Sequence, residues 1–207
     1  LKGPDHRVTS SNLVQFLCTA GPFSSRNLSV SWLKNSNEHP ASAPQLVPVN
    51  NHSYSVTSKA WVALTKQDIL SQITCKVTHG DIDEPLRMTI NLSQVVRVPP
   101  AVRVSQSSTV SSLVTVTCHV ERFYPKDICL TWLEDCHVIR RMDKPTPKRN
   151  EDGSYTLEIL QLVNASMQRS DQVLTCKVEH EAQPPIHASI ILSTASFPTH
   201  KAIRSLS

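Results

Sequence analysis

Residues 118–132 read Cys-His-Val-Glu-Arg-Phe-Tyr-Pro-Lys-Asp-Ile-Cys-Leu-Thr-Trp, and this stretch decides the fold of the chain. Apolar and polar residues alternate from Val114 to Val120, and they alternate again from Ile128 to Trp132. Alternation with a period of two is typical of β-strands that bury one face and expose the other. We therefore predict two strands joined by a turn, with Cys118 and Trp132 on their buried faces.

The same pattern occurs a second time in the chain. Three residues recur at offsets of 100, 100 and 101 positions: Cys18, Trp32 and Cys75 correspond to Cys118, Trp132 and Cys176. The flanking residues match as well, since Trp-Leu-Lys-Asn at 32–35 corresponds to Trp-Leu-Glu-Asp at 132–135. Three matches with similar neighbours predict a tandem repeat of one domain.

The spacing of Cys, Trp and Cys resembles that of an immunoglobulin sandwich, in which an inter-sheet disulfide packs against a tryptophan. The resemblance implies an all-β protein made of two tandem constant-type immunoglobulin-like Greek-key β-sandwiches. It also implies two disulfides, Cys18–Cys75 and Cys118–Cys176. Zinc ligation is the alternative for these cysteines, but they lack the Cys-x-x-Cys spacing of zinc sites, and the adjoining tryptophan favours the disulfide.

A chain of 207 residues has room for two domains of about 100 residues each, the usual size of such a sandwich. We predict that the first domain covers residues 1–98 and the second covers residues 99–193. The prolines at 99 and 100 mark the linker between them. Residues 194–207 show no periodicity, and we expect a disordered stalk or tail there.

Two predicted strands have a less regular pattern. We expect Met88–Val98 to form the last strand of the first domain. In the second domain, Leu157 and Ile159 share one parity, whereas Leu160 and Leu162 share the other. A β-bulge would bring both pairs to the same face, and we predict one in this strand.

Charge and cysteine content limit the partners and the compartment. The 21 Lys and Arg are interspersed with 17 Asp and Glu, for a net charge of +4, so no nucleic-acid footprint is present. Six cysteines in strand-like settings indicate an oxidising compartment. Four sequons agree with this, and they predict N-glycosylation at Asn27, Asn51, Asn91 and Asn164.

The sequence contains no leading signal peptide and no run of about 20 apolar residues. The cysteines and the four sequons predict an extracellular location, and the chain as given is expected to be either the ectodomain of a plasma-membrane protein or a secreted piece.

Motifs for catalysis are missing from the sequence. There is no Gly-x-Ser-x-Gly elbow, no phosphate-binding glycine loop and no His-Glu-x-x-His. We predict that the chain is not an enzyme and binds no cofactor, metal or small-molecule substrate. His79 and His180 each follow a cysteine of the repeat by four residues without a local ligand partner, which favours structural histidines hydrogen-bonded to nearby loops.

Trp61 lies between Ala60 and Val62, both of which we expect to face inward, so parity turns Trp61 outward. One interpretation is that the ring covers neighbouring strand residues or the core of a glycan. The other is that it contacts a partner, because exposed tryptophans are enriched in binding hot spots.

Several short motifs occur in order along both repeats. They include Leu-Thr-Trp-Leu-Glu at 130–134, Leu-Val-Asn-Ala-Ser at 162–166, Tyr-Ser-Val-Thr-Ser at 54–58 and Val-Arg-Val-Pro-Pro at 96–100. Together they resemble the two membrane-proximal constant-type domains of the signal-regulatory proteins (SIRP), over roughly residues 1–193. Antibody and histocompatibility domains usually carry Tyr two residues before the second cysteine. Here Ile73 and Leu174 occupy that position, and SIRP domains are similar in lacking the tyrosine.

The resemblance implies protein partners and a receptor context. In this family an upstream variable-type domain recognises integrin-associated protein, and a membrane segment with its tail carries the signalling role. The resemblance therefore implies that this chain is the extracellular spacer and association region of an immune cell-surface receptor. The alternative is an antigen-presentation or antibody-type constant module that pairs with another chain; the missing tyrosine and the four sequons argue against it.

Two cysteines, Cys129 and Cys136, are left over from the repeat. Seven residues of strand would separate them by about 23 Å at about 3.3 Å per residue. A disulfide tolerates a Cα separation of less than about 7 Å, so the two should not bridge each other. Each is then a free thiol or an intermolecular bridge. We predict a turn position for Cys136, and some SIRP relatives are similar in carrying an extra cysteine near this turn and in forming disulfide-linked homodimers.

Overall fold

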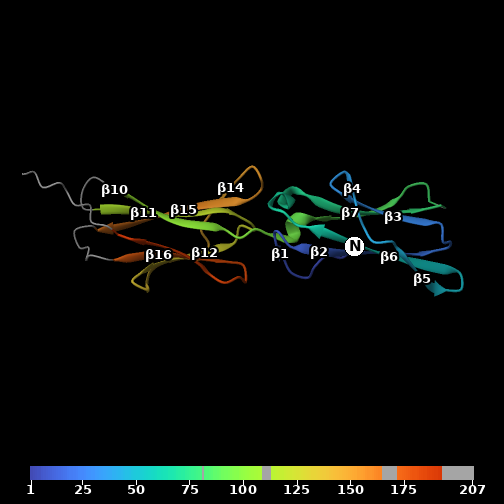
Figure 1. The fold of residues 1–207 in the computed structure, drawn as a ribbon, viewed down its shortest axis with the longest axis horizontal. Helices are drawn as coiled ribbons and strands as arrows, with labels where there is room; N and C mark the ends of the chain where they lie inside the picture. The colour runs from blue at the N-terminus through green and yellow to red at the C-terminus, as the bar shows by residue number, and fades with distance from the viewer. Residues whose placement is uncertain (81, 109–112, 165–171, 193–207) are drawn as a thin grey trace, which may run out of the picture. The chain divides into compact units, whose positions relative to one another are not determined.

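The structure is a computed structural model that describes residues 1–80, 82–108, 113–164 and 172–192. In these residues the chain is built from β-strands and two short 3-10 helices (Figure 1). It divides into two compact units; the first holds residues 1–100, 121–126 and 147–156, and the second holds the remainder. The boundary between residues 98 and 99 stays a prediction, and the predicted tail at 194–207 lies outside the described residues. No helix in the described part of the chain has the length and apolar character needed to cross a membrane.

The first sandwich consists of two sheets and a short parallel pair. One sheet has the order β2 (Leu13–Phe23), β6 (Ser53–Ala63) and β5 (Gln45–Asn50). The other has the order β4 (Asn37–His39), β3 (Leu28–Lys34), β7 (Gln72–His79) and β8 (Leu86–Asn91). The parallel pair joins β1 (Val8–Thr9) to β9 (Val96–Arg97). Alternating burial along β2 and β6 shows that one face of this sheet packs against the core while the other meets solvent.

The core of the first sandwich surrounds a disulfide between its two sheets. Cys18 on β2 is bonded to Cys75 on β7, and both side chains are almost completely buried. Trp32 pairs with Cys75 across β3 and β7, so its ring lies beside the disulfide. The indole N–H of Trp32 donates a hydrogen bond of 2.9 Å to Ser58 Oγ on β6. Because this serine is itself buried, the bond satisfies two polar groups that water cannot reach.

The second sandwich repeats the arrangement. One sheet has the order β10 (Ala101–Ser108), β11 (Leu113–Phe123), β15 (Tyr155–Asn164) and β14 (Lys148–Arg149). The other has the order β13 (His137–Met142), β12 (Ile128–Glu134), β16 (Val173–His180) and β17 (Ile186–Ile191). Cys118 on β11 is bonded to Cys176 on β16, and Trp132 pairs with Cys176 across β12 and β16. The two predicted immunoglobulin-like sandwiches, each with a disulfide, are confirmed.

The two cores differ at the tryptophan. Ile159 occupies the position in the second repeat that Ser58 occupies in the first, counting from the matching Tyr155 and Tyr54. The buried indole nitrogen of Trp132 consequently has no hydrogen-bond partner among the described residues. The second core therefore lacks a counterpart of the hydrogen bond that joins Trp32 to the opposite sheet in the first core.

The last strand of the first sandwich is not continuous, so the prediction for Met88–Val98 is wrong in this respect. Strand β8 ends at Asn91, and a 3-10 helix, η2 (Leu92–Gln94), precedes the short strand β9. Val95 and Val96 are both buried although they are consecutive in sequence. A regular strand would turn one of the two outward, so burying both requires the chain to leave the strand conformation.

The phase change predicted in the second sandwich does not occur either. Burial along β15 alternates without interruption, with Leu157 buried and Ile159 partly buried. Leu160 and Leu162 face the other way and are 56% and 59% exposed. The prediction of a bulge was wrong because it assumed that every leucine of the strand lies in the core.

A buried carboxylate closes the connection between β6 and β7 in the first sandwich. Asp68, in the 3-10 helix η1 (Lys66–Leu70), is almost fully buried and accepts a hydrogen bond of 2.7 Å from the backbone N–H of Thr65. The ammonium group of Lys34 lies 2.8 Å from its other oxygen. These contacts fix the corner that leads into β7.

The hydrogen bond between Trp32 and Ser58 yields a stability prediction. Ser58→Ala leaves the buried indole N–H unpartnered, and we expect it to lower the free energy of unfolding of the first sandwich by about 1–3 kcal/mol. Urea denaturation followed by circular dichroism measures the change. Ser31→Ala, at an exposed position of β3, serves as the control and should stay within about 0.5 kcal/mol of wild type. Equal effects of the two substitutions would contradict the assigned role of the hydrogen bond.

Candidate interaction surfaces

The strand-end histidines of the repeat are buried. His79 is 4% exposed, its Nε2 lies 3.0 Å from Ser25 Oγ, and its ring stacks on Phe23 with centroids 5.2 Å apart. His180 is 3% exposed at the end of β16. Among the described residues, no group of three or more His, Cys, Asp or Glu is arranged to hold a metal ion. The contacts of His79 agree with the structural interpretation of these residues.

Sequence reasoning missed a hydrogen-bonded chain on the second sandwich. Nε2 of His119 on β11 lies 2.8 Å from Ser105 Oγ on β10, and its Nδ1 lies 2.8 Å from Glu158 Oε1 on β15. The order serine, histidine and carboxylate is that of a catalytic triad. Here, however, the three residues lie on strands that are neighbours in one sheet. The adjoining backbone N–H groups therefore donate hydrogen bonds to the neighbouring strands and do not form an oxyanion hole.

We therefore interpret this chain of hydrogen bonds as a cross-strand link. Parity of β11 could have placed His119 on the outer face, but only the pairing of the strands brings Ser105 and Glu158 to its two nitrogens.

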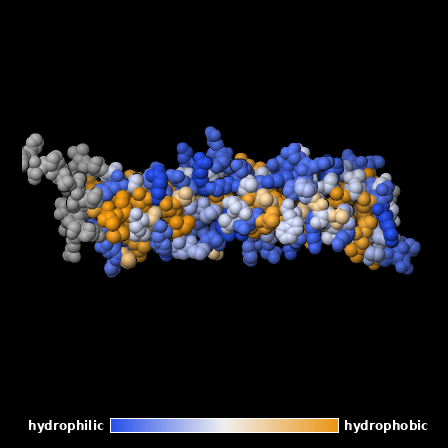
Figure 2. Space-filling view, viewed as in Figure 1, coloured by the Kyte–Doolittle hydropathy of each residue, from blue (hydrophilic) through white to orange (hydrophobic). Residues whose placement is uncertain are grey.

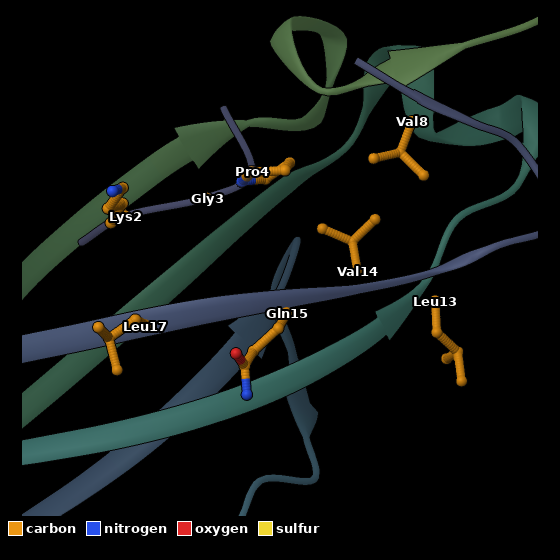
Figure 3. Close-up of a pocket in the computed structure, with 8 residues that line it drawn as sticks. All are labelled: Lys2, Gly3, Pro4, Val8, Leu13, Val14, Gln15 and Leu17. Atoms are coloured by element: carbon orange, nitrogen blue, oxygen red, sulfur yellow. The ribbon is translucent and has the colours of Figure 1, made fainter. Parts of the chain in front are cut away.

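A shallow cavity of about 380 Å³ lies beside β2 in the first sandwich (Figure 3). It is lined by Lys2, Gly3, Pro4, Val8, Leu13, Val14, Gln15 and Leu17. The N-terminal segment pairs with β2 at one point, where Lys2 and Leu17 exchange two backbone hydrogen bonds of 2.8 Å. In Figure 3 the side chains of Val8 and Val14 face each other, whereas Gln15 points the opposite way. Lys2 is the one charged residue of this lining, so the cavity offers no pair of acid and base groups.

Trp61 lies on the outer face of the sheet that contains β2, β6 and β5. It is 53% exposed, and it pairs with Gln15 of β2. Leu13, two residues from Gln15 on the same face of β2, is 65% exposed. The backbone carbonyl of Trp61 lies 2.8 Å from His39 Nε2. The first sandwich thus presents two large apolar side chains on one sheet face, and Figure 2 shows apolar side chains at the surface of both units.

The two leftover cysteines differ in their surroundings. Cys129 lies on β12, is partly buried, and its thiol donates a hydrogen bond of 3.7 Å to Asp143 Oδ1. Burial is the main cause that raises the pKa of the Cys129 thiol above its ordinary value. The same Asp143 accepts a hydrogen bond of 2.6 Å from Arg141, and this contact lowers the pKa of the carboxyl group. Because the thiolate is the reactive form, a raised pKa makes Cys129 a poor candidate for disulfide exchange.

Cys136 lies in the two-residue turn between β12 and β13 and is exposed. The flanking residues Glu134 and His137 pair with each other. Asp135 and Cys136 both have positive φ, 45° and 70°, as in the turns that join tight β-hairpins. Asp135 is held by two contacts with Val173, each of 3.1 Å. The turn therefore projects the Cys136 thiol into solvent.

All four predicted glycosylation asparagines are exposed. Asn27 lies between β2 and β3, and Asn51 lies in the turn between β5 and β6. Asn91 ends β8, and Asn164 ends β15. The rest of the sequon at Asn164 lies outside the described residues. The exposure of these side chains is compatible with N-glycosylation at each position, which stays a prediction.

Known proteins are similar to this chain over nearly its whole length. The family model described as the immunoglobulin C1-set domain matches residues 3–82 and 100–183. Tyrosine-protein phosphatase non-receptor type substrate 1 of Bos taurus is 40% identical over 199 residues, which are 95% of this chain and 39% of the relative. Signal-regulatory protein beta-1 of Homo sapiens is 38% identical over 95% of this chain and 50% of its own length.

A third relative, the Mus musculus form of the phosphatase substrate, is 38% identical over 98% of this chain and 42% of its own length. The chain thus spans two fifths to one half of the relatives that it matches. Two of these names describe a substrate of a tyrosine phosphatase and not a phosphatase. With matches over both sandwiches, this chain belongs to the immunoglobulin C1-set family, and its relatives over nearly its whole length are proteins of the signal-regulatory family.

Proposed function

We propose that this chain is an extracellular spacer and association region of an immune cell-surface receptor. The observation that carries the proposal is the match over 95% of this chain to signal-regulatory protein beta-1, of which it covers only 50%. Whatever the other half of such a protein does, this region contributes two sandwiches of the constant type. Its two disulfides and four exposed sequon asparagines support an oxidising, extracellular setting.

A deletion tests the spacer role. We expect a full-length receptor that lacks residues 1–193 of this region to bind its soluble protein ligand with an affinity within about threefold of wild type, since a spacer does not contact the ligand. Contact between a receptor cell and a ligand-bearing cell should change, because the binding domain then lies closer to the membrane. Surface plasmon resonance and a cell-conjugate assay measure the two effects. A loss of soluble binding beyond tenfold, about 1.4 kcal/mol, would show that the region takes part in ligand recognition.

We propose further that the region associates with a second copy of itself through Cys136. The exposed thiol is followed on β13 by Val138 and Ile139, which are 63% and 41% exposed. Strand β13 is the edge of its sheet and pairs only with β12 among the described strands. An exposed cysteine beside apolar residues on an edge strand supports a disulfide between two copies.

The cysteines provide a matched pair of variants for this proposal. We expect wild type and Cys129→Ser to migrate as covalent dimers on a non-reducing gel, and Cys136→Ser to migrate as a monomer. The raised pKa and the partial burial of Cys129 are the reasons for the difference. A monomer in all three lanes, or a dimer that survives only in Cys136→Ser, contradicts the assignment.

Trp61 is proposed as part of a contact surface on the first sandwich. Its exposed ring and the nearby Leu13 could be removed from water by a partner, and tryptophan is enriched in binding hot spots. Trp61→Ala should weaken association measured by analytical ultracentrifugation while the melting temperature stays within about two degrees, as is typical of surface substitutions. Lys59→Ala, on the same face of β6, is the control. A drop of several degrees in melting temperature with unchanged association would mean that the ring has a structural role.

A further inference from the structure

The outer face of the sheet containing β10, β11, β15 and β14 carries three exposed leucines. Leu113, Leu160 and Leu162 are 40%, 56% and 59% exposed. Leu160 and Leu162 alternate with covered residues on β15, so both point away from the core. Exposed apolar side chains that lie next to one another can mark a surface that a partner or a ligand covers.

The register of the strands brings the leucines together around one asparagine. His119 on β11 contacts Glu158 on β15. Counting outward from this pair along antiparallel strands places Leu113 opposite Asn164. The corresponding pairs of the first sandwich support this count, since Thr19 lies opposite Thr57 and Leu13 lies opposite Ala63 there.

Asn164 shares the exposed parity of β15 with both leucines of that strand. Leu162 lies two residues before it, about 6.6 Å away at about 3.3 Å per residue, and Leu160 lies one further step along the same face. Leu113 faces Asn164 from the neighbouring strand. The asparagine of a sequon therefore lies at the end of a surface formed by these three leucines.

We propose that the N-glycan on Asn164 lies along this surface and covers Leu113, Leu160 and Leu162. N-acetylglucosamine suits the surface, because its ring has an apolar C–H face and its acetyl group ends in a methyl. The polar edges of the sugar would meet the surrounding threonines, Thr115 and Thr117, which share the outer parity of β11. The inference rests on the proposed extracellular location, since only a chain that passes through the secretory pathway acquires the glycan.

A second copy of the chain fits this surface less well. A stable interface buries about 800 Å² on each partner, whereas three leucine side chains with a hydroxyl and carboxylate border offer much less apolar area. A glycan on Asn164 would also stand between two such sheet faces. In the first sandwich, Ala63 occupies the position that matches Asn164, so the face that bears Trp61 carries no sequon of its own at that point.

The test uses the whole chain secreted from mammalian cells with high-mannose glycans. Mass spectrometry first measures occupancy at each sequon. One sample is left intact, the second is trimmed in its folded state by an endoglycosidase to single N-acetylglucosamine residues, and the third is stripped by an amidase. Binding of bis-ANS, a dye that fluoresces on apolar surface, is then compared among the three.

We expect the stripped protein to show a severalfold higher dye fluorescence than the intact one, with the trimmed sample close to the intact one. The rise should disappear in a variant that combines Leu113→Thr, Leu160→Thr and Leu162→Thr. Asn164→Gln should reproduce the rise, whereas the control Asn91→Gln should not. Because the enzymes act on folded protein, the test stands even if Asn164→Gln is poorly secreted.

Several results would overturn the inference. Stripping that leaves the dye signal unchanged while Asn164 is occupied would show that the glycan does not cover the leucines. Dimers of the glycosylated protein that dissociate in the triple threonine variant would assign the surface to a second copy. Occupied Asn27, Asn51 and Asn91 beside an unoccupied Asn164 would reject this inference alone, whereas four empty sequons would also reject the proposed extracellular location.

Discussion

The disulfide between the two sheets of each sandwich is the interaction on which the rest of the structure depends. Cys18 and Cys75 lie 57 residues apart in sequence, and Cys118 and Cys176 lie 58 apart. Closing a loop of this length stabilises the folded chain by about 4 kcal/mol per disulfide, mainly by restricting the unfolded state. Each bond also joins a strand of one sheet to a strand of the other, and a tryptophan on the adjoining strand pairs with the second cysteine. The alternating strands then bury their apolar faces around that point.

Around this shared centre the two repeats differ in one core position and in the residues on their outer sheet faces. In the first, a buried serine satisfies the tryptophan and an exposed indole lies on the outer sheet face. In the second, an isoleucine replaces the serine, and leucines beside a sequon asparagine replace the exposed indole. The two cores thus share the arrangement of disulfide and tryptophan, while the outer sheet faces differ in their exposed side chains. Association and modification, the roles proposed for this region, lie on the parts of the surface that the frame leaves free.

Local pattern was sufficient to predict most of the fold. Period-two alternation gave the strands around Cys118 and Trp132, and the repeat gave the second sandwich without further information. The predictions failed where burial does not follow alternation. Val95 and Val96 are both buried because the chain leaves the strand at a 3-10 helix, and Leu160 and Leu162 are both exposed although leucine usually lies inside.

The surfaces were harder to predict because they depend on contacts between distant segments. Ser105, His119 and Glu158 come together only when three strands pair, and no local motif marks them. The difference between Cys129 and Cys136 was partly visible from parity and turn position. The contact of Cys129 with Asp143, which distinguishes its thiol chemically, required the pairing of β12 with β13.

The three tryptophans also make the intrinsic fluorescence of this chain informative about its folding. Trp32 and Trp132 each lie beside a disulfide, which quenches indole emission, and both should brighten when their sandwich unfolds. Only the ring of Trp32 has a hydrogen-bonded N–H among the described contacts, so Trp132 should emit at the shorter wavelength. Trp61 is 53% exposed, so it should emit further to the red and dominate the spectrum of the folded protein. The wavelength and intensity of tryptophan emission should thus distinguish the unfolding of one sandwich from that of the other in an unlabelled chain.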